Sequence, residues 1–501
     1  MVRMSRFEPL PLGQRIPARV HGVSCSLPTM EAVIGYEEKN PRITAQLTSG
    51  YPRFVLHPYV RQLSEIFRQE LNLRGHTLWL TCSPRAADEL KQEMGGAHVI
   101  RASHEGLPFV AHVDQPELNS RAKVFLQNTG GFLSSREAED HLVNRGAIER
   151  DPEVTYDGDA LGYVTRRVAE AFGTTAEQDV VLTPGGMSAF TAAWRSALDL
   201  QNSRGRTVWL QLGWLYLDTM ALMARVLGGP TRHIHITDVT DTAAILKVVE
   251  ECGDRLGGVV TEAPTNPLVQ TADLAVISDA VWKNGGLMLV DPSLLSPANV
   301  DILRYADLGV ASLTKYFANE GDVIAGAIVI NSVGPDAAHL RVHVAKRADS
   351  LYRRDLERLA AQLEALPEFV RRTNETTLAV LEFLQNHPAV KSVYWARHPE
   401  SRAAFDQIAR HPEYVGSLVS FTVKRPLTEV YDRMTLPKGP SFGMKTSLIS
   451  PYVYLAHYDL VTTVAGRQQL AQSEIEAELL RLSIGAEPAD EIIEALRQGL
   501  D

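Results

Sequence analysis

A series of short, continuously apolar segments, most of them separated by helical stretches, dominates the middle of the chain. These segments read VVLTP, TVWLQL, HIHIT, GVVTEAP, LMLVD and GVASLTK, and all lie between residues 180 and 315. Strands that are buried on both faces have continuous rather than alternating apolar sequences, which is typical of a parallel sheet covered by helices. The pattern predicts an α/β fold with a mostly parallel sheet, whose ligands bind at the carboxyl ends of the strands.

The segments on either side predict two further parts. The first 60 residues are rich in Pro and Gly and lack a sustained helical period, and a short α/β alternation follows them. After residue 349 comes a long, charged helical region, 356–386, and then strands and a last helix. A chain of 501 residues is too long for one simple core. We expect an N-terminal extension with a small α/β lobe (1–122), a large domain (123–348) and a smaller α+β C-terminal domain (349–501).

Composition narrows the classes of partner. The net charge of −10 and the absence of Lys/Arg clusters argue against a nucleic-acid partner. No apolar run approaches the length of a membrane span, and the first twenty residues lack the apolar core of a secretory signal. The three cysteines, Cys25, Cys82 and Cys252, are widely spaced, which favours a reducing compartment and no structural metal. We therefore expect a cytoplasmic protein with a small-molecule partner.

One lysine stands where two predicted strands meet. Lys315 follows the apolar run LGVASL and precedes the β-branched run GAIVIN, and the hydroxyls of Ser312 and Thr314 flank it. A partly desolvated lysine at a strand end can lose its proton and form a Schiff base with an aldehyde cofactor. A solvated lysine in a loop is the ordinary alternative. Other residues must therefore decide between the two interpretations.

Further candidates lie at the ends of other predicted strands. Asp291 could hold the ring nitrogen of such a cofactor protonated, or could simply cap a turn. The amides of Gly186 and Met187 could bind an anion at a helix N-terminus, and the amide of Asn266 could donate to a ring oxygen, although both motifs also occur as plain turns. Arg481 lies in an apolar run, where a guanidinium needs an anionic partner, either a substrate carboxylate or a structural carboxylate.

Taken together and in this order, TPGGM, EAPTNP, LMLVD, SLTKY and LLRLSIG resemble the motifs of the Cys/Met-metabolism family of pyridoxal-phosphate (PLP) enzymes, from about residue 151 to the C-terminus. VSCSLPTMEAVIGYEE and SGYPRFVLHP in the N-terminal part, with the later LYLDT, are similar to the long, fungal-type cystathionine γ-synthases. The resemblance implies the aspartate-aminotransferase fold (PLP fold type I). It also implies a homo-oligomer, a dimer or a tetramer of two tight dimers.

The resemblance also implies a role for each candidate. Lys315 binds PLP covalently, Asp291 pairs with the ring nitrogen and Asn266 with the ring oxygen. Arg481 and Ser441 hold the substrate carboxylate. The groups expected around the phosphate belong to Gly186, Met187, Ser312 and Thr314.

The chain departs from the family pattern at the aromatic residue that stacks on the cofactor. Short family members carry a tyrosine where this chain has Leu212, so stacking falls to Trp214 or Tyr216. The residues expected to reach a neighbouring subunit's phosphate are Tyr156 and Arg150, although their spacing differs from that of the family.

The expected activity is γ-replacement on an O-acylhomoserine, with cysteine as the nucleophile, as in cystathionine γ-synthase. The same fold and cofactor also serve γ- and β-lyases of sulfur amino acids and enzymes that add a carbon nucleophile at Cγ. A binding protein that retains the fold without catalysis is the alternative from another class. Loss of the lysine would be the simplest sign of such a protein, but Lys315, Asp291 and Arg481 are all present.

Overall fold

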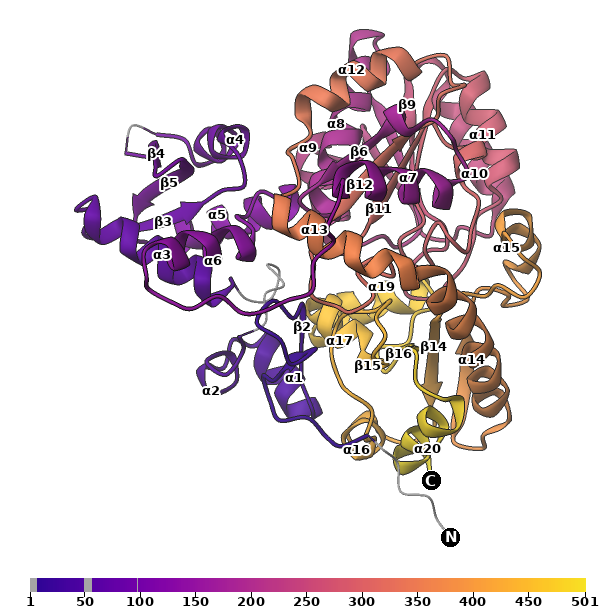
Figure 1. Ribbon diagram of the computed structural model, residues 1–501. Coiled ribbons are helices and arrows are strands. Elements are labelled where there is room, and N and C mark those ends of the chain that lie inside the picture. The colour runs from indigo at the N-terminus through magenta and orange to yellow at the C-terminus, as the bar shows by residue number, and fades with distance from the viewer. Residues whose placement is uncertain (1–6, 49–55, 97) are drawn as a thin grey trace.

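The computed structural model describes residues 7–48, 56–96 and 98–501, and a seven-stranded sheet lies at its centre (Figure 1). Its strand order is β6-β12-β11-β10-β9-β7-β8. Strand β12 is antiparallel to both of its neighbours, whereas the other pairs are parallel. The predicted mostly parallel sheet is therefore confirmed. The strands are Val180–Thr183 (β6), Val208–Leu212 (β7), His233–Ile236 (β8), Leu256–Glu262 (β9), Leu287–Asp291 (β10), Leu308–Ser312 (β11) and Gly326–Ile330 (β12).

Helices cover both faces of this sheet. Along β10, Leu287 and Leu289 pack into one apolar core, and Met288 and Val290 pack into the other, because successive side chains of a strand point to opposite faces. The first core contains α8 (Gly186–Ser203), α9 (Leu217–Leu227) and α12 (Ala337–Arg347). The second contains α7 (Ala160–Phe172), α10 (Thr242–Cys252), α11 (Leu274–Lys283) and α13 (Arg353–Gln362). Short 3-10 turns lie at Glu177–Asp179, Gly253–Arg255 and Leu303–Tyr305.

The predicted continuous helix over 356–386 is wrong. It is two helices, α13 and α14 (Leu366–Asn386), joined by a 3-10 turn at Leu363–Ala365. Pro367 lies in the first turn of α14, where a backbone N–H is not needed for the hydrogen bonds of that helix. A proline cannot continue the preceding helix, because it lacks the N–H that the next helical hydrogen bond needs.

An antiparallel four-stranded sheet follows, in the order β13-β14-β16-β15. The strands are Val390–Tyr394 (β13), Leu418–Val423 (β14), Leu448–Pro451 (β15) and Leu480–Ser483 (β16); β15 has no counterpart in the sequence prediction. The helices are Arg402–Ile408 (α15), Leu427–Arg433 (α16), Tyr452–Ala456 (α17), Tyr458–Thr462 (α18), Val464–Gln472 (α19) and Ala489–Leu500 (α20). This α+β part contains β16, the strand that carries Arg481.

The small α/β lobe in the N-terminal part has a three-stranded sheet in the order β3-β5-β4. Its elements are Pro58–Glu70 (α3), His76–Leu80 (β3), Pro84–Met94 (α4), Ile100–His104 (β4), Leu107–Val113 (β5), Pro116–Thr129 (α5) and Ser135–Asn144 (α6). Helix α5 runs across residue 122, where the sequence suggested a boundary. The domain limits at 122 and 348 stay predictions.

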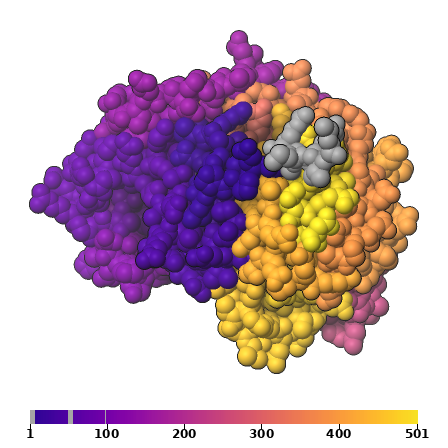
Figure 2. Space-filling view, turned by 90° about the horizontal axis from the view of Figure 1, so that it is seen from below, coloured from indigo at the N-terminus to yellow at the C-terminus, as the bar shows by residue number. Residues whose placement is uncertain are grey.

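The chain segment before the lobe packs against the C-terminal part, and Figure 2 shows this indigo surface beside the orange and yellow one. It contains Arg15–Ile16 (β1), Ser24–Cys25 (β2), Met30–Glu37 (α1) and Pro41–Thr44 (α2). The side chain of Thr29 caps α1, in a region where the sequence predicted irregular structure. Met30 and Tyr36 share an apolar core with Phe421. Residues 49–55 of the SGYPRFVLHP motif lie outside the described residues.

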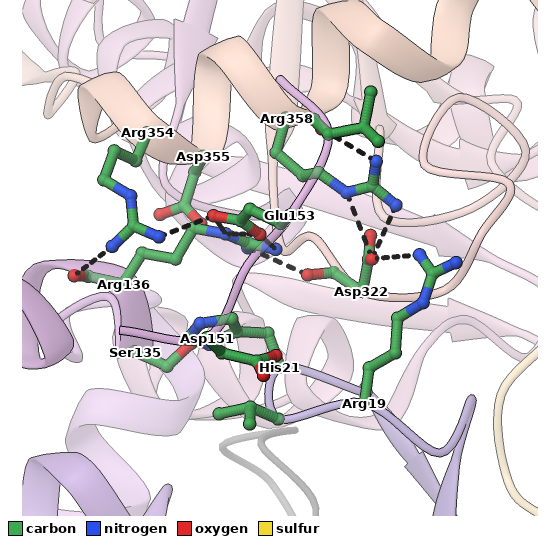
Figure 3. Close-up of polar contacts among 12 residues, drawn as sticks. Arg19, His21, Ser135, Arg136, Asp151, Glu153, Asp322, Arg354, Asp355 and Arg358 are labelled. Atoms are coloured by element: carbon green, nitrogen blue, oxygen red, sulfur yellow. Dashed lines mark hydrogen bonds and ion pairs between the residues drawn. The ribbon is translucent and has the colours of Figure 1, made fainter. Parts of the chain in front are cut away.

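Buried and half-buried ion pairs tie these segments to the loop that follows Lys315 (Figure 3). Arg136 of α6 reaches Glu153 at 2.8 Å and Asp355 of α13 at 2.9 Å. Asp322 accepts hydrogen bonds from Arg19 and from Arg358 of α13, both at 2.8 Å. The N-terminal segment, the lobe and α13 are therefore joined by charged side chains. Among the described helices, none is long and apolar enough to cross a bilayer.

Candidate active site

A cavity of about 450 Å³ lies where β9, β10 and β11 end, beside the C-terminal sheet and the lobe. Leu133, Ser135 and Glu137 of the lobe form part of its wall, a contribution that the sequence did not suggest. Ten of the predicted site residues line this cavity: Gly186, Met187, Tyr216, Asn266, Asp291, Ser312, Thr314, Lys315, Ser441 and Arg481. The parallel strands bring these residues together because their carboxyl ends meet at one edge of the sheet.

Lys315 lies in a fixed turn just after β11. Its side chain is 7% exposed, its Nζ donates to Ser441 Oγ at 2.9 Å, and the same nitrogen lies 4.8 Å from the centre of the Phe442 ring. The next residue, Tyr316, has a backbone φ of 55°, a value that residues other than Gly rarely adopt. Hydrogen bonds from Tyr316 to Gly443 O (2.7 Å) and Leu294 O (2.8 Å) hold this conformation. The lysine amine is therefore aimed into the cavity by its surroundings.

Two carboxyl groups lie side by side at the ends of β9 and β10. Asp291 accepts a hydrogen bond from the Ser293 amide at 2.7 Å, yet removal of water by the surrounding protein raises the pKa of Asp291 to about 6. Glu262 is the register partner of Asp291 and accepts a hydrogen bond from the Tyr216 amide at 2.5 Å. Burial, and then the neighbouring Asp291 charge, raise the pKa of Glu262 well above its usual range. A cationic ring nitrogen placed here would favour a charged Asp291.

The beginning of α8 forms an anion cradle. Its N-cap, Gly185, has no side-chain capping bond, so the first amides of the helix point toward the cavity edge. A Cβ at Gly186 would lie 2.9 Å from Ser312 Cβ, so only glycine lets this backbone approach the end of β11 so closely. In the same first turn, Ser188 Oγ is buried and has no hydrogen-bond partner among the described residues.

These groups, with the Ser312 hydroxyl, suit the phosphate of PLP. Thr314 plays a different part in the geometry. Its hydroxyl is engaged with Ala325, donating to the carbonyl at 3.3 Å and accepting from the amide at 3.1 Å. It therefore also fixes the turn that carries Lys315.

Arg481 and Asn266 contact each other at the wall of the cavity. Arg481 donates to Asn266 Oδ1 at 3.3 Å and to Pro440 O at 3.0 Å, and its guanidinium lies 4.9 Å from the Tyr452 ring centre. Asn266 Nδ2 donates to the Tyr452 hydroxyl at 2.8 Å. Arg481 also lines the cavity, and a guanidinium is a group that can bind a carboxylate there. Tyr452 was missed from the sequence, because α17 carries no motif that points to the site.

Three of the predicted residues, Trp214, Tyr156 and Arg150, lie away from the cavity. Gly213 turns with a φ of 76° after β7, and Trp214 enters an apolar core with Leu268, its ring centre 4.9 Å from that of His457. Of the two stacking candidates, only Tyr216 lines the cavity. Tyr156 stacks on Tyr163 with ring centres 4.9 Å apart.

The residues expected at a neighbouring subunit's phosphate site are thus held outside their own chain's cavity. Arg150 forms an ion pair with Asp140 at 2.7 Å.

The α/β fold, the lysine at a strand end and the carboxyl and anion sites around it define a PLP-dependent enzyme of fold type I. The family model described as "Cys/Met metabolism PLP-dependent enzyme" matches residues 163–501. The chain belongs to this family, and its cofactor is PLP.

Relatives that match the whole chain include enzymes of different activities. An L-2-amino-4-chloropent-4-enoate dechlorinase/desaturase of Streptantibioticus cattleyicolor is 35% identical over 498 residues, which are 99% of each chain. A cystathionine gamma-synthase of Neurospora crassa is 24% identical, with 98% of each chain covered. The similarity to the fungal-type enzymes is thereby confirmed over the whole length.

Among solved structures, cystathionine gamma synthase from Xanthomonas oryzae pv. oryzae in complex with cystathionine superimposes with a TM-score of 0.57 and 26% identity. The superposition covers 90% of that chain but 70% of this one. The family model likewise begins only at residue 163. The N-terminal lobe therefore lies outside the family model.

Proposed function

We propose that this enzyme eliminates a leaving group from Cγ of an α-amino acid. The observation that carries the proposal is that Lys315, Asp291 and Arg481 line the same cavity, with the lysine amine hydrogen-bonded to Ser441. Bound PLP supplies an electron sink that makes the α- and then the β-protons of an attached amino acid acidic. The protein has to bind the substrate carboxylate, hold the cofactor ring protonated and move these protons.

Each residue has a distinct part in this proposal. Arg481 binds the α-carboxylate, which fixes Cα over the lysine side of the cavity. The Lys315 amine, positioned by Ser441, takes the proton from Cα and serves again as acid and base at Cβ and Cγ. Asp291 keeps its charge beside the ring nitrogen and so keeps that nitrogen protonated. Tyr216 forms the aromatic wall.

The first substrate class is an O-acylhomoserine. A carboxylate leaves Cγ, the thiolate sulfur of cysteine bonds to the same carbon, and cystathionine and a carboxylic acid are the products. Fungal cystathionine gamma-synthases of nearly the same extent support this class. The chain would then be a cystathionine γ-synthase, as the sequence motifs imply.

A second class is a γ-chloro amino acid with a γ,δ double bond. The dechlorinase/desaturase shares 35% identity over 99% of both chains, more than the fungal synthases share. Here chloride leaves Cγ with a proton from the substrate, and no nucleophile is needed. Both classes require the same lysine, carboxyl and guanidinium groups.

The test incubates the holoenzyme with O-acetyl- or O-succinylhomoserine, with and without cysteine, and separately with L-2-amino-4-chloropent-4-enoate. Mass spectrometry and chloride release identify the products, and Lys315→Ala protein is the control. Cystathionine formed only with cysteine supports γ-replacement, and free chloride supports dechlorination. Formation of 2-oxobutyrate and ammonia regardless of cysteine would indicate a γ-lyase. If none of these reactions releases the group that was attached to Cγ, the proposal is contradicted.

A further inference from the structure

Glu262 is a buried carboxyl group in the active site to which the mechanism above gives no role. It ends β9, its Cα pairs with that of Asp291 at the end of β10, and both side chains line the cavity. Glu262 is 8% exposed, and the positive charge of Arg481 lowers its pKa less than burial and Asp291 raise it. Two neighbouring buried carboxyl groups cannot both be charged without a large electrostatic free-energy cost.

Its surroundings decide which of the pair holds the proton. Asp291 faces Glu262 from β10, Arg481 contributes a positive charge from β16, and Lys315 lies across the cavity after β11. A protonated cofactor ring nitrogen needs its carboxylate partner charged, and Asp291 is the residue in that place. Once Asp291 is charged, a second negative charge on its buried neighbour is strongly disfavoured. The start of α9 favours a negative charge on Glu262, but this helix-terminus effect is smaller than the repulsion from a buried like charge beside it.

The hydrogen bond of Glu262 reaches the segment that carries the aromatic wall of the cavity. Glu262 Oε1 accepts from the Tyr216 amide at 2.5 Å. Tyr216 is the N-cap of α9, and no side chain of that cap satisfies the first amides of the helix. A neutral carboxyl still accepts this bond through its carbonyl oxygen.

We propose that Glu262 is a positioning residue: in its uncharged form it anchors the Tyr216 backbone and leaves Asp291 as the charged member of the pair. Glu262 therefore sets both the place of the aromatic wall and the charge beside the cofactor ring. The proposal rests on the PLP chemistry of the family and not on the substrate, so it can fail or succeed independently of the γ-elimination proposed above.

Two variants separate anchoring from charge. Gln keeps the shape and the accepting oxygen and is always neutral, whereas Ala removes the anchor. Cofactor affinity is measured by titrating the apo-protein with PLP and following the change in visible absorbance. Glu262→Gln should bind PLP within about twofold of the wild type, and Glu262→Ala about tenfold more weakly, the effect of one lost buried hydrogen bond. Equal weakening in both variants would overturn the proposal.

The pH profile of the bound cofactor tests the charge directly. If Glu262 is already neutral, the absorbance of the Glu262→Gln holoenzyme titrates at the same pH as that of the wild type. A shifted profile at neutral pH would mean that the glutamine replaced a charged group, and the proposal would be wrong. This readout needs neither turnover nor a folded Glu262→Ala variant.

The apo-protein supplies a further check. A carboxyl whose pKa is raised on folding stabilises the fold at low pH, and this contribution is lost as pH rises above the ordinary value. Between about pH 4.5 and 7, the denaturation midpoint of Glu262→Gln should therefore rise relative to the wild type. A constant difference between the two proteins would contradict a protonated Glu262.

Discussion

At the scale of single residues, the decisive group is the amine of Lys315. In Lys315→Ala the covalent attachment of PLP should be lost, because Lys315 is the one lysine among the described residues that line the cavity. The variant should lose the visible absorbance of lysine-bound PLP and at least about a thousandfold in turnover. Lys346→Ala, at an exposed position of α12, is the control. A chromophore in Lys315→Ala that borohydride still reduces would assign the attachment to another lysine.

Many site residues could be predicted because they end parallel strands or sit in the turns that follow them. Asp291, Asn266 and Lys315 are brought together by sheet topology alone. The choice between Trp214 and Tyr216 could not be made in this way, because it depends on a turn at Gly213 and on packing against the distant His457.

Glu262 was missed although the sequence carried a signal for it. Glu262 is a charged residue at the end of the apolar run GVVTE, just as Arg481 is a charged residue within the apolar run LLRLSIG. The same reasoning about a costly buried charge would have found both residues.

At the scale of elements, α13 links the lobe to the active-site loop through buried charges. Arg358 donates to Asp322 at 2.8 Å and 3.1 Å and to Val154 O at 2.9 Å, and its side chain is 4% exposed. Arg358→Ala leaves a buried carboxylate with fewer partners and should lower the free energy of unfolding by about 3 kcal/mol. Arg371→Ala on α14 removes an exposed arginine with two carboxylate partners and should cost less than about 1 kcal/mol. Equal effects in denaturant titrations would contradict the structural role of the network.

The start of α3 should make stability depend on pH. His57 caps this helix by accepting from the Tyr59 amide and donates to Val20 O, and burial lowers the pKa of His57 from 6.5 to about 3. Below pH 6.5 the unfolded chain binds a proton that the folded chain does not. The stability present above pH 6.5 is therefore lost as pH falls toward 3, by up to about 1.4 kcal/mol per pH unit.

The check compares denaturation midpoints of the wild type and His57→Asn from pH 7 to 4.5. Asparagine keeps the cap but does not titrate, so its midpoint should fall less steeply. Parallel curves would show that His57 takes up its proton without unfolding.

Element boundaries were predictable where the sequence itself contains the stop signal. The limits of α4 follow from Ser83, Pro84 and Gly95. The break between α13 and α14 was missed because charged and apolar residues continue through Pro367. Helix α1 was missed because its burial on several sides, against the C-terminal core, leaves no polar face to give a period.

At the scale of the whole molecule, the resemblance to the family predicts a homo-oligomer. Val154 before α7 (73%) and Leu161 in its first turn (57%) are exposed, an arrangement that suits coverage by another subunit. Light scattering of the holoenzyme should give the mass of a dimer or a tetramer. Val154→Glu with Leu161→Glu should shift this mass toward the monomer, whereas Val333→Glu, at an 87% exposed position elsewhere, should leave it unchanged. A wild-type mass near 55.2 kDa would contradict the prediction.

The cavity is lined by residues from His21 to Arg481, and edge strand β6 pairs with β12, which is made long after it. During synthesis on the ribosome, β6 has to wait for β12, and Arg481 of the cavity wall is made long after Lys315. Long-range pairing of this kind is slow to form. A chain that lacks β12 or β16 therefore has an incomplete cavity, and we expect PLP loading to follow synthesis of both strands.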